Sequence, residues 1–200
     1  MSGASVSVDR LLVRRSQLQD ESDAGYLLRS ASLNGLARPL WVQSAQGRSV
    51  MSPGLGLPRW CASCLAADAP YWRRVWTDGR AICVTHGCWL EDHCGRCGTR
   101  ASWRSLRLRT CRCGWELRTA EPMPLSANLR MLNELPQGQG DFSWCELNVN
   151  SRWNLADVLG ALDIHGLSGK PMKRTSGTSV ATEREVASRG AAILHDAAMG

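Results

Sequence analysis

Cysteine and histidine side chains that could bind a metal ion recur in closely spaced pairs in the middle of this 200-residue chain. Eight of the nine cysteines lie between Cys61 and Cys113. Structural zinc sites use four thiolate or imidazole ligands in a closed tetrahedron, and pairs of ligands on tight turns supply them. The spacing predicts two zinc ions per chain, held by two consecutive tetrads: Cys61, Cys64, Cys83 and His86, then Cys94, Cys97, Cys111 and Cys113.

Cys88 and His93 leave an alternative assignment open, because each lies close enough in sequence to substitute for His86 or Cys94. We favour the tetrads above because every ligand pair in them keeps two intervening residues, or one in the last pair. Cys88 and Cys145 are then free thiols, and burial as small apolar side chains accounts for both.

The sequence also predicts the compartment. No apolar run approaches the roughly 20 residues of a membrane span. Met1–Asp20 lacks the uninterrupted apolar core of a secretory signal. Nine cysteines cannot all pair in disulfides, and CxxC pairs in a reducing compartment are typical of zinc sites. We therefore expect a cytoplasmic protein that has no membrane partner.

Motifs of zinc and thiol enzymes are not found in the sequence. A zinc deaminase needs His-x-Glu followed by Pro-Cys-x-x-Cys, and a metalloprotease helix needs His-Glu-x-x-His. A redox role for Cys61 and Cys64 would need a surrounding βαβ pattern, which the sequence does not show. We therefore expect closed structural sites, no catalytic residue and no enzyme activity.

The elements that must position the ligands indicate a small α+β fold. Acids at Asp20–Asp23 and the pair Asn34-Gly35 bound a predicted helix, and a second short helix at Leu36–Trp41 would make a helix-turn-helix-like module. Within the zinc region we expect a short helix in Ala69–Trp76, a strand in Arg80–Val84 and a strand or hairpin in Trp103–Arg109. Later helices are predicted at Ser126–Leu135, Asn154–Leu162 and from Thr182 to Leu194.

This reading divides the chain into four parts. They are an N-terminal arm at 1–19 (a strand or a disordered segment), the helix-turn-helix-like module at 20–50, two tandem zinc-finger or zinc-ribbon modules at 51–120, and C-terminal helices at 121–200 with a polar linker at 168–182. A segment rich in proline and glycine, Met51–Pro58, marks the boundary between the helix-turn-helix-like module and the zinc modules.

Tryptophan and arginine are concentrated in the zinc region. Six of the nine tryptophans lie between Trp60 and Trp115, which suits a small core of wide rings. Trp72 and Trp76 are expected to pack over the metal, with base stacking as the alternative. Seven arginines and one acid lie between Arg96 and Arg118. This basic face could contact phosphates or an acidic protein, or it could simply be solvated; the candidate contacts are Arg100, Arg104, Arg107, Arg109 and Arg112.

Together these motifs resemble the TniQ family of transposition proteins over about residues 20–120. The resemblance rests on Glu21-Ser22, Leu28-Arg29, Asn34-Gly35, Cys61–Cys64, Tyr71-Trp72-Arg73, Cys83–His86 with Gly87, Cys94–Cys97, and Cys111–Cys113 with Gly114. The Cys-Pro-x-Cys usual in the family is Cys61-Ala62-Ser63-Cys64 here, and the missing proline is not a ligand. The C-terminal helices resemble the helical part that longer members carry.

The resemblance implies a non-catalytic target-selection adaptor. Proteins like TniQ link a target-recognising component to an AAA+ ATPase regulator, which recruits the transposase. That component is a CRISPR effector with guide RNA in CRISPR-associated transposons, and a target DNA site in others. A second copy of the chain, in a homodimer, is an alternative partner that the sequence leaves open. The alternative is a zinc-ribbon protein that binds DNA or RNA and is unrelated to transposition.

Overall fold

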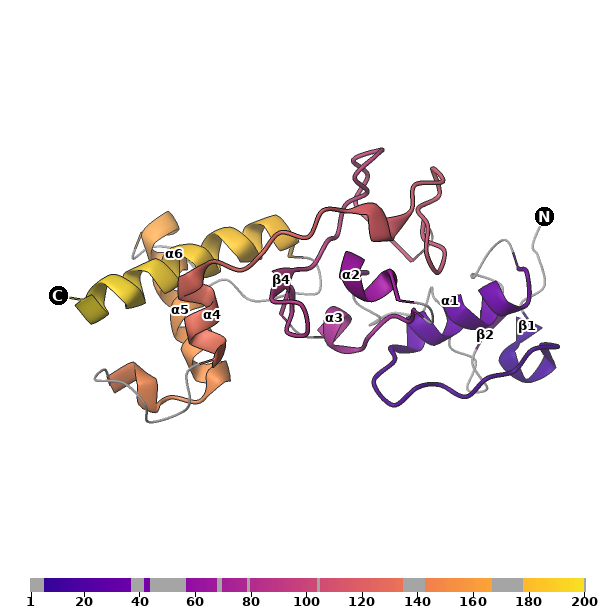
Figure 1. The fold of residues 1–200 in the computed structure, drawn as a ribbon, viewed down its shortest axis with the longest axis horizontal. Helices are drawn as coiled ribbons and strands as arrows, with labels where there is room; N and C mark the ends of the chain where they lie inside the picture. Colours follow the sequence, from indigo (N-terminus) through magenta and orange to yellow (C-terminus); the bar gives the residue numbers. More distant parts are fainter. Residues whose placement is uncertain are drawn as a thin grey trace. The chain divides into compact units, whose positions relative to one another are not determined.

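The computed structural model describes residues 6–36, 42–43, 57–67, 70–78, 80–103, 105–134, 143–166 and 178–199 (Figure 1). They belong to two units, Met1–Met123 and Pro124–Gly200. The chain is a small α+β protein whose regular structure is mostly helical. Most of the segment rich in proline and glycine, Met51–Pro58, and most of the linker predicted at 168–182 lie outside the described residues.

No helix in the described part of the chain combines the length and the apolar composition that crossing a lipid bilayer requires.

Helix α1 (Asp23–Leu33) forms where the acidic cluster and the Asn-Gly pair predicted it. The Ser22 hydroxyl accepts a hydrogen bond from the Gly25 N–H at 3.0 Å, and Asp23 lies in the first turn, where a carboxylate favours the helix dipole. Asn34 caps the other end, and Gly35 follows with a φ of 64°, a conformation that costs glycine little.

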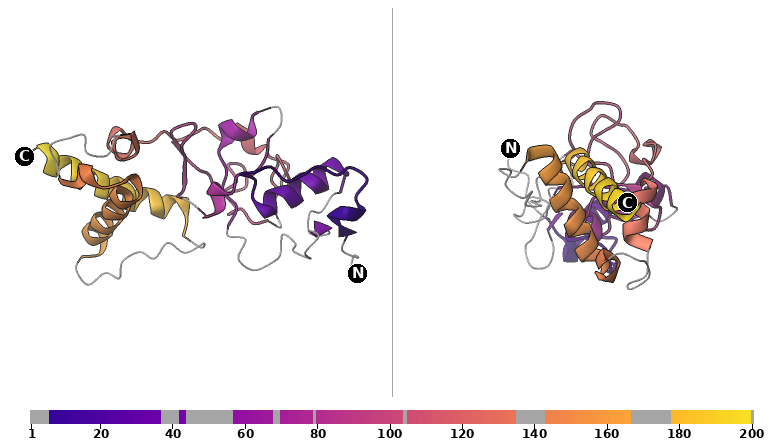
Figure 2. Two further views of the ribbon diagram at one scale, coloured as in Figure 1. Left: turned by 90° about the horizontal axis from the view of Figure 1, so that it is seen from below. Right: turned by 90° about the vertical axis from the view of Figure 1, so that its left-hand side faces the viewer.

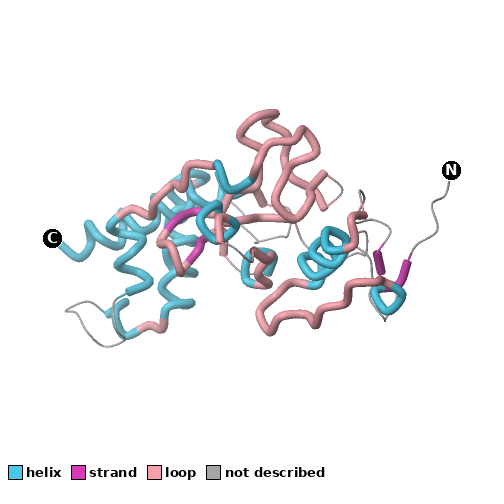
Figure 3. The backbone as a smooth tube through the Cα atoms, turned by 45° about the vertical axis from the view of Figure 1, so that its right-hand side comes forward, coloured by secondary structure: helices cyan, strands magenta, loops and turns pink. Residues whose placement is uncertain are grey.

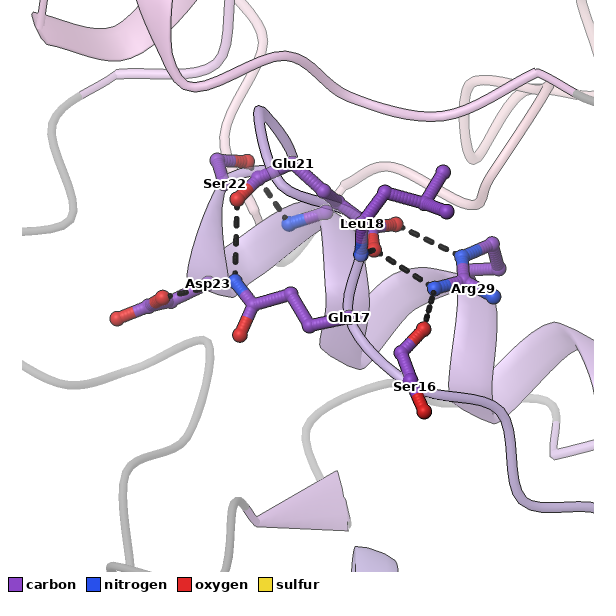
Figure 4. A network of polar contacts seen from close by, with 8 residues as sticks. Ser16, Gln17, Leu18, Glu21, Ser22, Asp23 and Arg29 are labelled. Atoms are coloured by element: carbon purple, nitrogen blue, oxygen red, sulfur yellow. Dashed lines mark hydrogen bonds and ion pairs between the residues drawn. The ribbon is translucent and has the colours of Figure 1, made fainter.

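A buried ion pair holds the start of α1 (Figure 4). Arg29 donates from Nε and Nη2 to the two carboxylate oxygens of Glu21, at 2.8 and 2.7 Å. The Glu21 side chain is fully buried and also accepts from the Leu18 N–H. The Arg29 guanidinium reaches the Ser16 carbonyl oxygen as well. The segment that precedes α1 is therefore attached to the second turn of the helix.

The helix-turn-helix-like module is not confirmed. Its second helix was predicted at Leu36–Trp41, and all of that segment except Leu36 lies outside the described residues. The described neighbours are short: β1 (Val6–Ser7), a 3-10 turn η1 (Val8–Arg10), and β2 (Val42–Gln43), which pairs with β1 in parallel.

The first cysteine tetrad is carried by four short elements. These are α2 (Ala62–Leu65), α3 (Val75–Asp78) and an antiparallel pair, β3 (Ile82–Cys83) and β4 (Cys88–Trp89). The strand predicted at Arg80–Val84 is thus present as β3. The helix predicted at Ala69–Trp76 is wrong over Pro70–Arg74, which is not helical. There the backbone pairs with the residues before α1: Ser22 donates to the Trp72 carbonyl at 2.8 Å, and Arg74 donates to the Asp20 carbonyl at 2.7 Å.

The second tetrad lies in backbone that is mostly loop (Figure 3). The strand or hairpin predicted at Trp103–Arg109 is reduced to isolated bridges, Leu106 with Cys111 and Thr110 with Glu116. A 3-10 turn, η3 (Leu117–Thr119), ends this part.

Tryptophan rings form the core of the first unit. Trp72 lies against three other indoles, with ring centroids 6.1 Å from Trp60, 6.1 Å from Trp76 and 5.3 Å from Trp103. Trp60 and Trp72 have no exposed surface. Gly25 of α1 packs so closely on Trp72 that a Cβ at Gly25 would lie 2.5 Å from the Trp72 Cβ. Core packing is therefore the role of Trp72 and Trp76.

The second unit is helical, as predicted, and Figure 2 shows its helices from two further sides. Helix α4 (Ala127–Glu134) is capped by Ser126, whose hydroxyl accepts from the Leu129 N–H. A 3-10 turn η4 (Ser143–Glu146) precedes α5 (Val149–His165), which starts earlier than predicted because Asn148 caps it. Helix α6 (Val180–Met199) packs along α5.

Glycines set the close approach of α5 and α6. A Cβ at Gly160 would lie 1.9 Å from the Val186 carbonyl oxygen, and one at Gly190 would lie 1.7 Å from the Ala156 carbonyl oxygen. Real Cβ atoms do not approach a carbonyl oxygen so closely. The backbones of the two helices are therefore in direct contact, which only residues without a side chain allow.

Candidate metal centres

The first candidate centre brings together the four predicted ligands from separate elements. Cys61 precedes α2, Cys64 lies in α2, Cys83 ends β3, and His86 lies in the turn between β3 and β4. Their ligand atoms all lie within 4.8 Å of one another. The four residues can hold one metal ion.

The distances in this group fit a tetrahedron. Nδ1 of His86 is 3.5, 3.3 and 3.5 Å from the sulfurs of Cys61, Cys64 and Cys83. The Cys64 and Cys83 sulfurs are 3.7 Å apart. Bonds of about 2.3 Å to sulfur and 2.0 Å to nitrogen place tetrahedral ligands about 3.5 Å apart for nitrogen and sulfur and about 3.8 Å apart for two sulfurs. A single ion at the centre would be within bonding distance of all four.

The second candidate centre has four thiols, from Cys94, Cys97, Cys111 and Cys113, also within 4.8 Å of one another. The Cys94 and Cys113 sulfurs are 3.5 Å apart, and those of Cys97 and Cys111 are 3.9 Å apart. Gly98 follows the first pair with a φ of 65° and Gly114 follows the second with a φ of 86°. The chain can therefore fold back around the ligand atoms at both turns.

The close packing of the thiols in the first group shifts their pKa values in opposite directions. Hydrogen bonds among neighbouring thiols lower the pKa of Cys61, mainly through Cys64, to about 6, and lower that of Cys83, mainly through Cys61. The same contacts raise the pKa of Cys64, again mainly through Cys61. Packed thiolates repel one another, so some keep their protons. A bound cation removes this conflict because it stabilises every thiolate at once.

In the second group, too, the pKa values of two thiols are shifted in opposite directions. Hydrogen bonds from Thr99 lower the pKa of Cys97 to about 6, and burial raises the pKa of Cys111 to about 12. Cys97 and Cys113 are exposed, whereas Cys94 and Cys111 are buried. An ion would therefore enter from the side of the exposed thiols.

His93 and Cys88, the alternative ligands, lie outside both groups of mutually close atoms. The His93 imidazole lies 2.7 Å from the carboxylate of Asp92, a buried residue that also pairs with Arg100 at 3.4 Å. Cys88 is buried, and its sulfur lies 3.8 Å from that of Cys61. Sequence reasoning missed the role of Asp92, although its position next to His93 was a usable signal.

The candidate arginine contacts separate into three cases. Arg100 is paired with Asp92, so its charge is partly neutralised. Arg104 lies outside the described residues. Arg107, Arg109 and Arg112 are exposed. The acid of this segment, Glu116, binds Arg118 at 2.6 Å. Arg107, Arg109 and Arg112 therefore bring exposed positive charge to the segment that carries the second centre.

Comparison of the chain with protein-family models, with curated protein sequences and with solved structures found no match.

Proposed function

We propose that this chain is a non-catalytic adaptor of the TniQ kind, stabilised by two zinc ions and acting in the choice of a transposition target. It would link a target-recognising component, either a CRISPR effector with guide RNA or the target DNA, to an AAA+ ATPase regulator. One observation carries the proposal. Residues of the motifs that resemble TniQ form hydrogen bonds and ion pairs with one another and pack in one hydrophobic core.

Those contacts join the motifs at α1 to the Tyr71-Trp72-Arg73 motif. Glu21 pairs with Arg29, and Ser22 joins the start of α1 to Trp72 through its N–H. Asp20, just before the motif, accepts from Tyr71 and Arg73. Short motifs that occur together by chance are not expected to contact one another in the fold. Here motifs that are far apart in sequence do so. This supports the resemblance as a whole over any single CxxC pair.

Zinc is the metal we propose for both centres. Sets of three thiolates with one imidazole, and of four thiolates, in a tetrahedron are the ligand sets of structural zinc. Four protein ligands would complete the coordination of each ion, which would leave no position for a substrate. The ions would supply folding free energy, on the order of 10 kcal/mol or more.

An open hollow beside α1 suits a protein partner. It has a volume of about 280 Å³ and lies where the end of α1 meets the loop that carries Arg107. Its lining is about half apolar and half polar, and it includes one arginine, Arg107. An ATPase segment with an apolar residue next to an acid would match both features. The lining residues are Leu28, Ala31, Ser32, Gly35, Leu36, Arg107 and Leu108.

The test is co-purification. Tagged full-length chain is expressed with the products of neighbouring genes, and bound proteins are identified after a nuclease wash. An AAA+ ATPase that remains after the wash is the expected result. Recovery of nuclease-sensitive nucleic acid alone would contradict the adaptor and favour the zinc-ribbon nucleic-acid binder.

A pair of variants tests the hollow separately. Ser32→Glu places an acid in the hollow, where it would compete for Arg107, and should reduce the recovered ATPase. Leu33→Glu adds the same charge at the next residue of α1, which does not line the hollow. Equal recovery with both variants would place the ATPase contact elsewhere and leave the adaptor itself standing.

The second candidate, nucleic-acid binding, is favoured by the exposed arginines at 107, 109 and 112. Phosphate neutralisation by such side chains supplies most non-specific affinity. An adaptor that touches target DNA or guide RNA would use the same surface.

A further inference from the structure

A fifth sulfur atom lies beside the first metal centre, outside the four mutually close ligand atoms. The Sγ of Cys88 is 3.8 Å from the Sγ of Cys61. Cys88 is also the cross-strand partner of Cys83 in the β3–β4 pair. Two of the three cysteine ligands are thus direct neighbours of a thiol that the four-ligand set does not use.

The distance is the one that two ligands of one ion would have. Bonds of about 2.3 Å at a tetrahedral angle place two sulfurs about 3.8 Å apart. The Cys64 and Cys83 sulfurs, which both belong to the tetrad, are 3.7 Å apart. Cys88 therefore lies at ligand spacing from Cys61, and its strand fixes it there.

The two candidates for the fourth position differ in how they are held. His86 is exposed and lies in the turn that joins β3 to β4. Cys88 is 3% exposed and belongs to a paired strand. The imidazole can turn away toward solvent without disturbing the core, whereas the Cys88 sulfur stays beside the ion site.

We propose that Cys88 is a reserve ligand of the first metal centre, which replaces His86 and converts three thiolates and one imidazole into four thiolates. The bond from the ion to Nδ1 of His86 breaks and a bond to the sulfur of Cys88 forms. The thiol proton of Cys88 passes to the released imidazole or to water. Soft divalent cations, zinc and above all cadmium, favour the four-thiolate form. This inference rests on the metal centre of the proposed function.

Cobalt substitution reads the ligand set directly, because the visible absorption of tetrahedral Co²⁺ and its thiolate charge-transfer band change with each sulfur. The full-length chain is titrated with Co²⁺ as wild type, His86→Ala, Cys88→Ser and His86→Ala/Cys88→Ser. We expect two bound ions in the wild type, in Cys88→Ser and in His86→Ala, with one more thiolate bond in the spectrum of His86→Ala. The double variant should lose one of the two ions.

Controls separate the reserve ligand from simpler explanations. His86→Ala/Cys145→Ser removes a buried thiol of the second unit instead and should behave as His86→Ala. His86→Gln repeats the test with a polar residue in the turn. Loss of the ion in both His86→Ala and His86→Gln, or equal binding by His86→Ala and His86→Ala/Cys88→Ser, would overturn the proposal. Fewer than two ions in the wild type would instead contradict the proposed metal centres.

Discussion

The indole nitrogen of Trp72 donates a hydrogen bond to the carbonyl oxygen of Leu108 at 3.1 Å, and this bond ties the first metal module to the second. The Trp72 carbonyl in turn accepts from Ser22 at the start of α1. Trp60 repeats the arrangement, because its indole donates to the Leu117 carbonyl at 3.2 Å. The two centres and α1 therefore share one core, and we expect them to unfold together.

Substitution of Trp72 by phenylalanine tests this coupling. The change keeps an aromatic ring but removes the N–H, so the Leu108 carbonyl loses its donor. We expect a loss of about 1–3 kcal/mol in the free energy of unfolding, measured by urea titration of the metal-loaded chain. Both metal ions should then become easier to chelate. Trp115→Phe, at a partly exposed ring, is the control, and a loss confined to one ion would show that the modules are independent.

The buried pair of Glu21 and Arg29 gives a second prediction. Arg29→Met removes the cation and leaves a fully buried carboxylate without its partner, which typically costs about 3–5 kcal/mol. In the double variant, Glu21→Gln/Arg29→Met, the buried charge is removed while the glutamine oxygen still accepts from the Leu18 N–H. This variant should therefore recover part of the free energy of unfolding that Arg29→Met loses. The measurement is a double-mutant cycle by urea unfolding. Additive losses in the cycle would mean that the pair is not coupled.

Local signals predicted much of this fold from the sequence. Ser22, Asn34 and Gly35 bound α1, and Ser126 caps α4, because caps depend on a few neighbouring residues. The two ligand groups also followed from spacing alone, since a tetrahedral site constrains residue types and intervals so strongly.

Non-local contacts account for what the sequence could not show. Tyr71–Arg74 have a helical pattern, but they are not helical because their backbone pairs with Asp20 and Ser22, some 50 residues earlier. Arg100 read as part of a basic face, but it pairs with the buried Asp92. In the first case a partner distant in sequence determines the backbone conformation, and in the second a buried partner determines the pairing of the side chain. Local patterns carry no information about such partners.

Removal of one ligand tests the second centre. Cys97→Ser should lose one zinc per chain, because a hydroxyl is a poor substitute for a thiolate and structural zinc provides much of the folding free energy of a small module. Metal analysis of the purified chain gives the stoichiometry, and limited proteolysis reports the fold. Cys145→Ser, at a cysteine of the second unit, is the control. Retention of two ions and of protease resistance would contradict the ligand assignment.

The second unit should be more stable in weak acid than in weak base. Burial, with a further contribution from the charge of Glu183, raises the pKa of the Asp157 carboxyl from near 3.8 to about 7. The folded state then keeps a proton that the unfolded state releases, so this contribution to the free energy of unfolding is full below pH 4 and is lost as the pH rises to 7. Asp157→Asn should remove this dependence.

Urea unfolding of wild type and Asp157→Asn at pH 5 and pH 8 measures the effect as a difference between the two proteins. The variant should gain stability relative to wild type as the pH rises. Asp163→Asn is the control, because Asp163 is exposed and pairs with Arg189 at 2.9 Å. A difference that does not change with pH would show that Asp157 ionises normally.

The exposed arginines beside the second centre give the last prediction. If Arg107 and Arg112 each neutralise a phosphate, Arg107→Gln/Arg112→Gln should weaken binding to a mixed-sequence duplex and lower the slope of log K against log salt by about 2. Fluorescence anisotropy at several salt concentrations measures the slope. The control variant, Arg74→Gln/Arg118→Gln, removes the same net charge. Arg118 is already paired with Glu116, so the salt slope of this variant should stay near that of wild type. An unchanged slope in the first variant would identify the basic face as merely solvated, because counterion release requires that the protein replaces the ions on the phosphates.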